Sequence, residues 1–250
     1  MINAFLSALS FYTRIPVPRR IHFNEEDLNK GTRFLPLIGI IVGGFSAGIL
    51  YLTHLVFSYP TAVVCSLIAS VFLTGAFHED GFSDTCDGLG GGWTIEEKLR
   101  IMKDSRVGAY GLIGTVLLFL LKFCLMVELG ETRIIPALFI AASGSRLVPV
   151  YLISFLPYVR TDETSKAKPL AKKIGFFGTV LATITVAVTF FIVNPYFLIL
   201  CAVLIILAGL FALFYKRKMG GYTGDMLGAG QQVSEVILYA LLIISWKYFL

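Results

Sequence analysis

Long apolar runs constrain the fold of this 250-residue chain more than any other feature. The runs cover 34–57, 61–77, 109–128, 134–157, 175–193, 195–215 and 233–249. Each is close to the roughly 17–25 residues that a helix needs to cross a bilayer. Charged residues make up 15% of the chain, against about 25% in ordinary soluble domains. The sequence predicts one all-α domain over residues 1–250, a polytopic integral membrane helix bundle with about seven transmembrane helices.

Basic residues alternate from side to side between these runs. They cluster before the first run and in every second loop after it, whereas Arg133 and Lys247 are expected on the opposite side. By the positive-inside rule, the N-terminus and three long loops are predicted to be cytoplasmic. The protein is therefore expected in the cytoplasmic (inner) membrane, with its active site facing the cytoplasm. Residues 1–12 are apolar but too short to cross, and we predict an interfacial helix there.

An acidic motif follows the second run, at 78–88 (HEDGFSDTCDG). Asp80, Asp84 and Asp87 are spaced i, i+4, i+7, which places them on one face of a helix. Ionised carboxylates at close range repel one another unless a cation lies between them, and oxygen ligands suit Mg²⁺ or Mn²⁺. The motif predicts a site for a hard divalent cation, Mg²⁺ or Mn²⁺, with these three residues and Glu79 as ligands. We expect the second membrane helix to continue through the motif.

The next residues of the same loop could hold phosphate. Gly90 and Gly91 belong to a glycine cluster whose N–H groups can face an anion in an open turn. Lys103 and Arg106, in IMKDSRVGAYG, are predicted to bind phosphate oxygens. Asp104 lies between them, and is predicted to complete the metal shell or to act as a general base.

A third polar stretch precedes the last run, at 220–232 (GGYTGDMLGAGQQ). Its glycines, amides and single carboxylate are unusual for a simple connector. Thr223 and Asp225 are predicted to contact the metal or a nucleotide, and Glu235 lies close beyond them.

Two basic residues lie inside predicted membrane helices, where charge is costly and usually has a partner. Arg146 follows a small-residue patch, and we expect it to pair with the aspartates or with substrate phosphate. Lys122 is expected to snorkel toward the outer interface.

Other features exclude several classes of function. The four cysteines form no CxxC pair, which argues against a zinc site or a disulfide framework. The net charge of +5 follows from basic loops, so no nucleic-acid partner is expected. The sequence is compatible with a homo-oligomer but does not specify one.

The three motifs HEDGFSDTCDG, IMKDSRVGAYG and GGYTGDMLGAGQQVSE, with FLSALSFYTRIPVP near the N-terminus, resemble the cobalamin synthase family of adenosylcobinamide-GDP ribazoletransferases. The resemblance covers nearly the whole chain. It implies a Mg²⁺-dependent membrane enzyme that joins α-ribazole, or its 5′-phosphate, to adenosylcobinamide-GDP and releases GMP. In that chemistry Asp84 and Asp87 would be catalytic through the metal, and Asp104 would take the proton of the ribose hydroxyl.

Two other functions remain open on the sequence. Asp84 to Gly88 fits the start of the CDP-alcohol phosphatidyltransferase motif, but Gly91 and Gly92 replace its Ala-Arg, and Ser105 and Ala109 replace its later aspartates. A phospholipid product is therefore the alternative for an enzyme. A cation or solute transporter is the alternative of another class, although transporter sites favour the membrane midplane over its rim.

Overall fold

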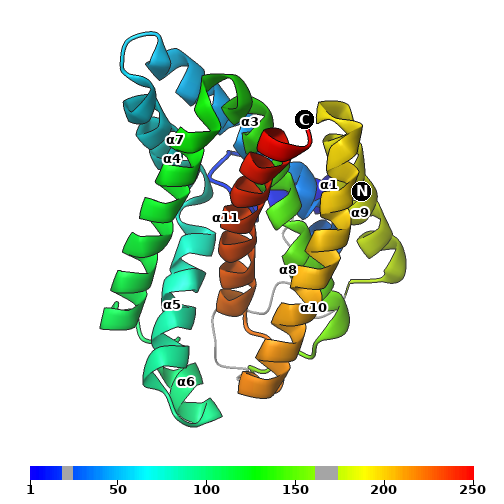
Figure 1. Cartoon of the computed structure of the whole chain (residues 1–250). Helices are drawn as coiled ribbons and strands as arrows, with labels where there is room; N and C mark the ends of the chain where they lie inside the picture. Colours follow the sequence, from blue (N-terminus) through cyan, green and yellow to red (C-terminus); the bar gives the residue numbers. More distant parts are fainter. Residues whose placement is uncertain (19–24, 161–173) are drawn as a thin grey trace.

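The computed structural model describes residues 1–18, 25–160 and 174–250. These residues are helical throughout apart from turns, loops and one isolated bridge between Tyr158 and Tyr222 (Figure 1). The elements are α1 (Ile2–Tyr12), α2 (Glu25–Gly31), η1 (Thr32–Phe34), α3 (Leu35–His54), α4 (Tyr59–Thr74), α5 (Phe77–Gly91), α6 (Ile95–Ile101), α7 (Ala109–Ser145), α8 (Leu147–Phe155), α9 (Phe176–Val193), η2 (Pro195–Leu198), α10 (Ile199–Met219) and α11 (Gly224–Tyr248). The predicted all-α membrane bundle is confirmed.

The number of crossings depends on two breaks. Within the described ranges, 5 helical stretches are long and apolar enough to cross a membrane, or 6 if α4 and α5 count as one. The longest stretch, Ala109–Phe155, has 47 residues and would extend about 70 Å, far beyond a hydrocarbon core of about 30 Å. Gly130 interrupts it with φ 74°, a conformation that glycine adopts readily. We therefore count this stretch as two crossings, which agrees with the division that the sequence predicted at the same place.

A second break separates α4 from α5 and corrects one prediction. Gly75 and Ala76 both have positive φ, and the two helices meet at 89°. The second membrane helix therefore does not continue straight through the acidic motif, as we had expected. The motif forms a helix of its own, which packs between α7 and α11.

The last helix, α11, occupies the centre of the bundle. It contacts α5, α7, α8 and α10, as Figure 1 shows. The outer faces of α9, α10 and the first half of α7 expose apolar side chains such as Ile184, Ile206 and Leu117. An apolar outer surface suits contact with lipid. The polar residues of α11, in contrast, are buried, and they indicate a site inside the bundle.

Local signals fix the segments at the lower end of Figure 1. Thr94 and Glu97 form a reciprocal capping box at the start of α6. Lys216, Arg217 and Lys218 lie in the last turn of α10, where cations offset the helix dipole. Beyond α10, the N–H of Tyr222 donates to the carbonyl of Pro157 at 3.0 Å. This pairing brings the segment after α8 beside the start of α11.

Candidate functional site

The site is built on a close contact between α5 and α11. A Cβ atom on Gly81 would lie 2.9 Å from both Cα and O of Asp225. One turn along, a Cβ on Gly228 would lie 2.9 Å from the carbonyl oxygen of His78. The helices therefore run antiparallel with their backbones touching. This contact places the acidic motif directly against the polar stretch that precedes the last membrane helix.

A cavity of about 480 Å³ opens beside this contact. Asp80 lines it from α5 and Asp225 from α11. Arg160 lines it from the segment after α8, and its Nη2 lies 2.6 Å from Oδ2 of Asp225. Three charged side chains from separate parts of the sequence thus face one cavity, which is an arrangement suited to a charged ligand.

Asp84 joins this group from the next turn of α5. Its side chain is half-buried and interacts electrostatically with Asp80, Asp225 and Arg160. The sequence predicted the grouping of Asp80 with Asp84, and also a ligand role for Asp225. The structure brings these three carboxylates together. It also adds Arg160, a residue of the basic loops for which no site role was predicted.

Asp87, the third member of the predicted stripe, holds another helix in place. Its Oδ2 accepts from the N–H of Gly108 and its Oδ1 from the N–H of Gly111, each at 2.8 Å. These N–H groups lie at the start of α7, where the helix itself provides no acceptor. The carboxylate is buried. It therefore caps α7, and each of its oxygens already has a donor.

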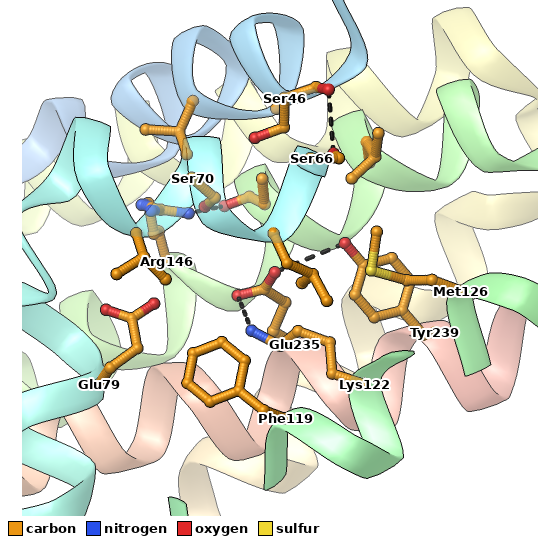
Figure 2. Close-up of a pocket in the computed structure, with 16 residues that line it drawn as sticks. Ser46, Ser66, Ser70, Glu79, Phe119, Lys122, Met126, Arg146, Glu235 and Tyr239 are labelled. Atoms are coloured by element: carbon orange, nitrogen blue, oxygen red, sulfur yellow. Dashed lines mark hydrogen bonds and ion pairs between the residues drawn. The ribbon is translucent and has the colours of Figure 1, made fainter. Parts of the chain in front are cut away.

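Glu79 faces away from the cavity, into the bundle. It lines a small space of about 20 Å³ together with Arg146, Lys122 and Glu235. Figure 2 shows these four side chains. All four side chains are buried. Lys122 does not snorkel as predicted, because its ammonium lies 3.3 Å from Oε2 of Glu235 and 2.8 Å from Oε1 of Gln232. Arg146 donates to the carbonyl of Ala142 instead of reaching the aspartates.

Two glutamines complete this buried network. Their amides are unusual for a simple connector, but no specific role was predicted for them. Nε2 of Gln232 donates to Oε1 of Glu79 at 2.9 Å, which links α11 to α5. Nε2 of Gln231 donates at 2.9 Å to Oε2 of Glu235 and to Oγ of Ser145. The network ties α5, α7 and α11 together. We refer to Glu79, Lys122, Arg146, Gln231, Gln232 and Glu235 as the buried network.

The residues predicted to hold phosphate lie apart from the cavity lining. Gly90 and Gly91 form the last turn of α5 and do not make an open loop. Arg106 is exposed and pairs with Asp104 through its Nε and Nη2, at 3.1 and 2.7 Å. These bonds hold the pKa of Asp104 at about 2, below the usual 3.8. Lys103 is also exposed.

Thr223 has a local role. Its Oγ1 accepts from the N–H of Met226 at 3.3 Å, which caps the first turn of α11. Thr223 is buried and also hydrogen-bonds to Asp225. It therefore fixes the end of α11 that carries Asp225 into the cavity.

The acidic side chains fit a magnesium ion only together with a ligand. In the described ranges, no three His, Cys, Asp or Glu side chains lie close enough to hold a metal by themselves. Mg²⁺ is commonly held by one or two carboxylates with substrate phosphates and water as the other ligands. Asp80 and Asp84, side by side on α5 and near the cavity, match that smaller requirement.

The fold and the site define a multi-pass membrane protein with a charged cavity between helices. A family model described as cobalamin-5-phosphate synthase matches residues 4–243. Adenosylcobinamide-GDP ribazoletransferase of Shewanella pealeana is 44% identical, over 98% of this chain and 97% of that protein. The protein of the same name in Shewanella oneidensis is 42% identical, over 97% and 94%. No solved structure matches.

The chain therefore belongs to the cobalamin-5-phosphate synthase family, and it is a transferase of cobalamin nucleotide-loop assembly. The resemblance seen in its sequence motifs is confirmed. The phospholipid and transporter alternatives are set aside by this membership.

Proposed function

We propose that this chain joins α-ribazole, or α-ribazole 5′-phosphate, to adenosylcobinamide-GDP in the charged cavity, with Mg²⁺ as cofactor. The products are adenosylcobalamin, or its 5′-phosphate, and GMP. One observation carries the assignment to this cavity. Asp80, Asp225 and Arg160 line one cavity of about 480 Å³ in this chain. A cavity with these charges suits the charged diphosphate substrate that membership of the family implies.

The reaction exchanges one phosphorus–oxygen bond for another. The ribose hydroxyl of ribazole forms a bond to the phosphorus next to the cobinamide. The bond from that phosphorus to the oxygen shared with GMP breaks, and that oxygen leaves with GMP. The hydroxyl proton needs an acceptor, and the negative charge of the diphosphate needs compensation.

Asp80 and Asp84 are the residues that would hold the magnesium ion. When bound, the ion neutralises charge on the diphosphate and on the departing GMP. Arg160 is placed to bind a phosphate oxygen, since a guanidinium recognises phosphate and carboxylate in similar ways. It now pairs with Asp225, so phosphate would compete with that carboxylate.

Asp225 is our proposed proton acceptor. It lies in the cavity, and release of Arg160 to phosphate would leave its carboxylate free to accept the hydroxyl proton. Asp104, the base expected from the sequence, is a weaker choice because it lies outside the cavity lining and its low pKa makes it a poor acceptor.

The distribution of basic residues among the loops supports a cytoplasmic location for the cavity. The acidic motif, the segment after α8 and the start of α11 were all predicted on the basic side of the membrane. A cytoplasmic cavity in the inner membrane would give direct access to a large water-soluble corrinoid and to ribazole.

Turnover by purified protein in detergent or liposomes tests the proposal. Adenosylcobinamide-GDP and α-ribazole 5′-phosphate are mixed with Mg²⁺ or with EDTA, and GMP and the corrinoid are followed by chromatography. We expect GMP and a matching corrinoid product with Mg²⁺ only. Folded protein that makes neither product would contradict the proposal. Equal turnover in EDTA would contradict the magnesium requirement alone.

A further inference from the structure

A group of aromatic rings lines the same cavity. Phe77 packs edge-to-face against Phe11 at 5.1 Å and against Tyr12 at 5.4 Å between ring centroids. The rings of Tyr12 and His78 lie parallel at 6.2 Å. All four residues line the cavity. We refer to Phe11, Tyr12, Phe77 and His78 as the aromatic cluster.

The bend between α4 and α5 brings the cluster together. The chain just after α1 is fixed to the end of α4, where the N–H of Arg14 donates to the carbonyl of Leu73 at 2.7 Å. Phe77 is the first residue of α5, directly after the bend. The last residues of α1 and the first residues of α5 therefore meet at the cavity.

The cluster and the carboxylates share one face of α5. Asp80 lies three residues after Phe77, and Asp84 lies seven after it, which are spacings that stack side chains on one helical stripe. Three residues advance a helix by about 4.5 Å. An aromatic surface is thus followed by Asp80 within about one helical turn and by Asp84 within about two.

This order matches the order of groups in a nucleoside. A ligand lying along α5 would place its base against the aromatic cluster and its ribose beside Asp80. The cavity of about 480 Å³ falls within the range of about 300–1,000 Å³ usual for small-molecule sites. A whole corrinoid is much larger than a nucleoside, so only part of that substrate could enter.

We propose that the aromatic cluster binds the dimethylbenzimidazole base of α-ribazole, and this inference rests on the function proposed above. The base is planar and apolar, and in the nucleoside it has one ring nitrogen left to accept a hydrogen bond. Burying it in an aromatic pocket therefore costs little desolvation. Guanine, the other base in the reaction, carries a carbonyl, an amine and an N–H that would all need partners.

Two substitutions test the pocket in the full-length protein. Phe77→Ala and Tyr12→Leu each remove one ring, and we expect each to raise the KM for α-ribazole about tenfold, as loss of a base-stacking contact does. The KM for adenosylcobinamide-GDP should stay within about twofold, because its binding does not use the cluster. Tyr12→Phe keeps the ring, so it should raise the KM for α-ribazole less than Tyr12→Leu does. Phe72→Ala is the control, because it removes an exposed ring near the bend that does not line the cavity, and it should match wild type.

Binding to wild-type protein provides a second test that needs no variant and no turnover. Equilibrium dialysis compares α-ribosides of dimethylbenzimidazole, benzimidazole and adenine in the absence of corrinoid. We expect affinity to fall in that order, as apolar area is lost and polar edges are added. Equal affinity for the adenine riboside would overturn the proposal. A raised KM for adenosylcobinamide-GDP alone, in Phe77→Ala or Tyr12→Leu, would also overturn it.

The two proposals fail in different ways. If wild type binds α-ribazole in the expected order but makes no corrinoid product, the reaction is wrong and the base pocket stands. If wild type turns over normally and both ring deletions leave the KM for α-ribazole unchanged, the base pocket is wrong and the reaction stands.

Discussion

The ammonium of Lys122 and the carboxylate of Glu235 lie 3.3 Å apart inside the helix bundle, with side chains only 4% and 11% exposed. Gln232 bonds Lys122 at 2.8 Å and Glu79 at 2.9 Å, so the ion pair is connected to the helix that carries the acidic motif. Glu79 is the neighbour of Asp80 in the chain. The buried network thus holds one face of α5 while a neighbouring face presents carboxylates toward the cavity.

Removing one charge of this pair should destabilise the protein. In Lys122→Met, Glu235 keeps a buried charge without its closest cation, which costs about 3–5 kcal/mol of unfolding free energy. Thermal unfolding in one detergent would show a lower Tm. The matched control is Lys247→Met, which removes an exposed lysine from the same bundle. A Lys122→Met, Glu235→Gln double variant should regain much of the loss, and equal Tm values for the two lysine variants would argue against the pair.

Asp84 and Asp87 should separate into a functional and a structural residue. Asp84→Asn should lower kcat about a hundredfold or more with little change in Tm, because it removes a proposed metal ligand. In Asp87→Asn, an amide NH₂ replaces one carboxylate oxygen and faces a backbone N–H at the start of α7. One of the two capping hydrogen bonds is therefore lost. We expect a cost of about 1–3 kcal/mol in stability, measured by the same thermal unfolding. Unchanged stability in Asp87→Asn would contradict the capping role.

Arg160 should matter more than Arg106 for the diphosphate substrate. Arg160→Gln removes the guanidinium that lines the cavity, and loss of a charge-assisted hydrogen bond should raise the KM for adenosylcobinamide-GDP about tenfold or more. Arg106→Gln serves as the control, because its exposed side chain pairs with Asp104 outside the cavity lining. Steady-state kinetics at saturating ribazole separates the two. A larger effect at Arg106 would return that residue to the site.

The contact at Gly81 predicts a sharp response to one added methyl group. In Gly81→Ala, the new Cβ would press against the backbone of Asp225 and force α5 and α11 apart. We expect a cost of about 1–3 kcal/mol in stability and a loss of turnover. Gly48→Ala in α3 is the matched control, since nothing lies within 4 Å of its new Cβ. There, removal of a flexible glycine should stabilise the helix by about 0.5–1 kcal/mol.

The pH profile tests whether Asp104 is a base in the reaction. Its pKa of about 2 keeps it ionised at any pH used for assay, and Arg106→Gln should return that pKa toward 3.8. A catalytic base would then move the acid limb of kcat/KM to higher pH in the variant. We expect the profiles of wild type and variant to superimpose, because Asp104 lies away from the cavity. The pair itself contributes to stability above the unfolded pKa, and that contribution is lost as pH falls through about 2.

The membrane helices and the acidic stripe were predictable because each depends on local periodicity. Apolar length identified the spans, and Gly130 marked the turn between two of them. The spacing of Asp80 and Asp84 needed only the pitch of a helix. Their joint placement near the cavity follows directly from that spacing.

Other features depend on contacts between distant segments and left little local signal. Gly75 suits the positive φ at the bend, but Ala76 adopts positive φ without being glycine or asparagine, so packing imposes that part of the bend. Asp87 continues the spacing of Asp80 and Asp84, but it accepts hydrogen bonds from the start of α7, a contact that the spacing does not predict. Arg160 reaches Asp225 because Tyr158 pairs with Tyr222, a contact that no helical period reveals.

The position of α11 at the centre of the bundle means that the earlier helices complete their packing only after α11 has inserted. The ribosome makes α11 after α5 and α7, yet Gln232 and Glu235 on α11 are the partners of Glu79 and Lys122 on those earlier helices. Until α11 inserts, Glu79 lacks its hydrogen bond from Gln232, and Lys122 lacks its ion pair with Glu235. A chain shortened before α11 would therefore keep Glu79 and Lys122 without these partners, and it would lack the α11 residues that line the cavity.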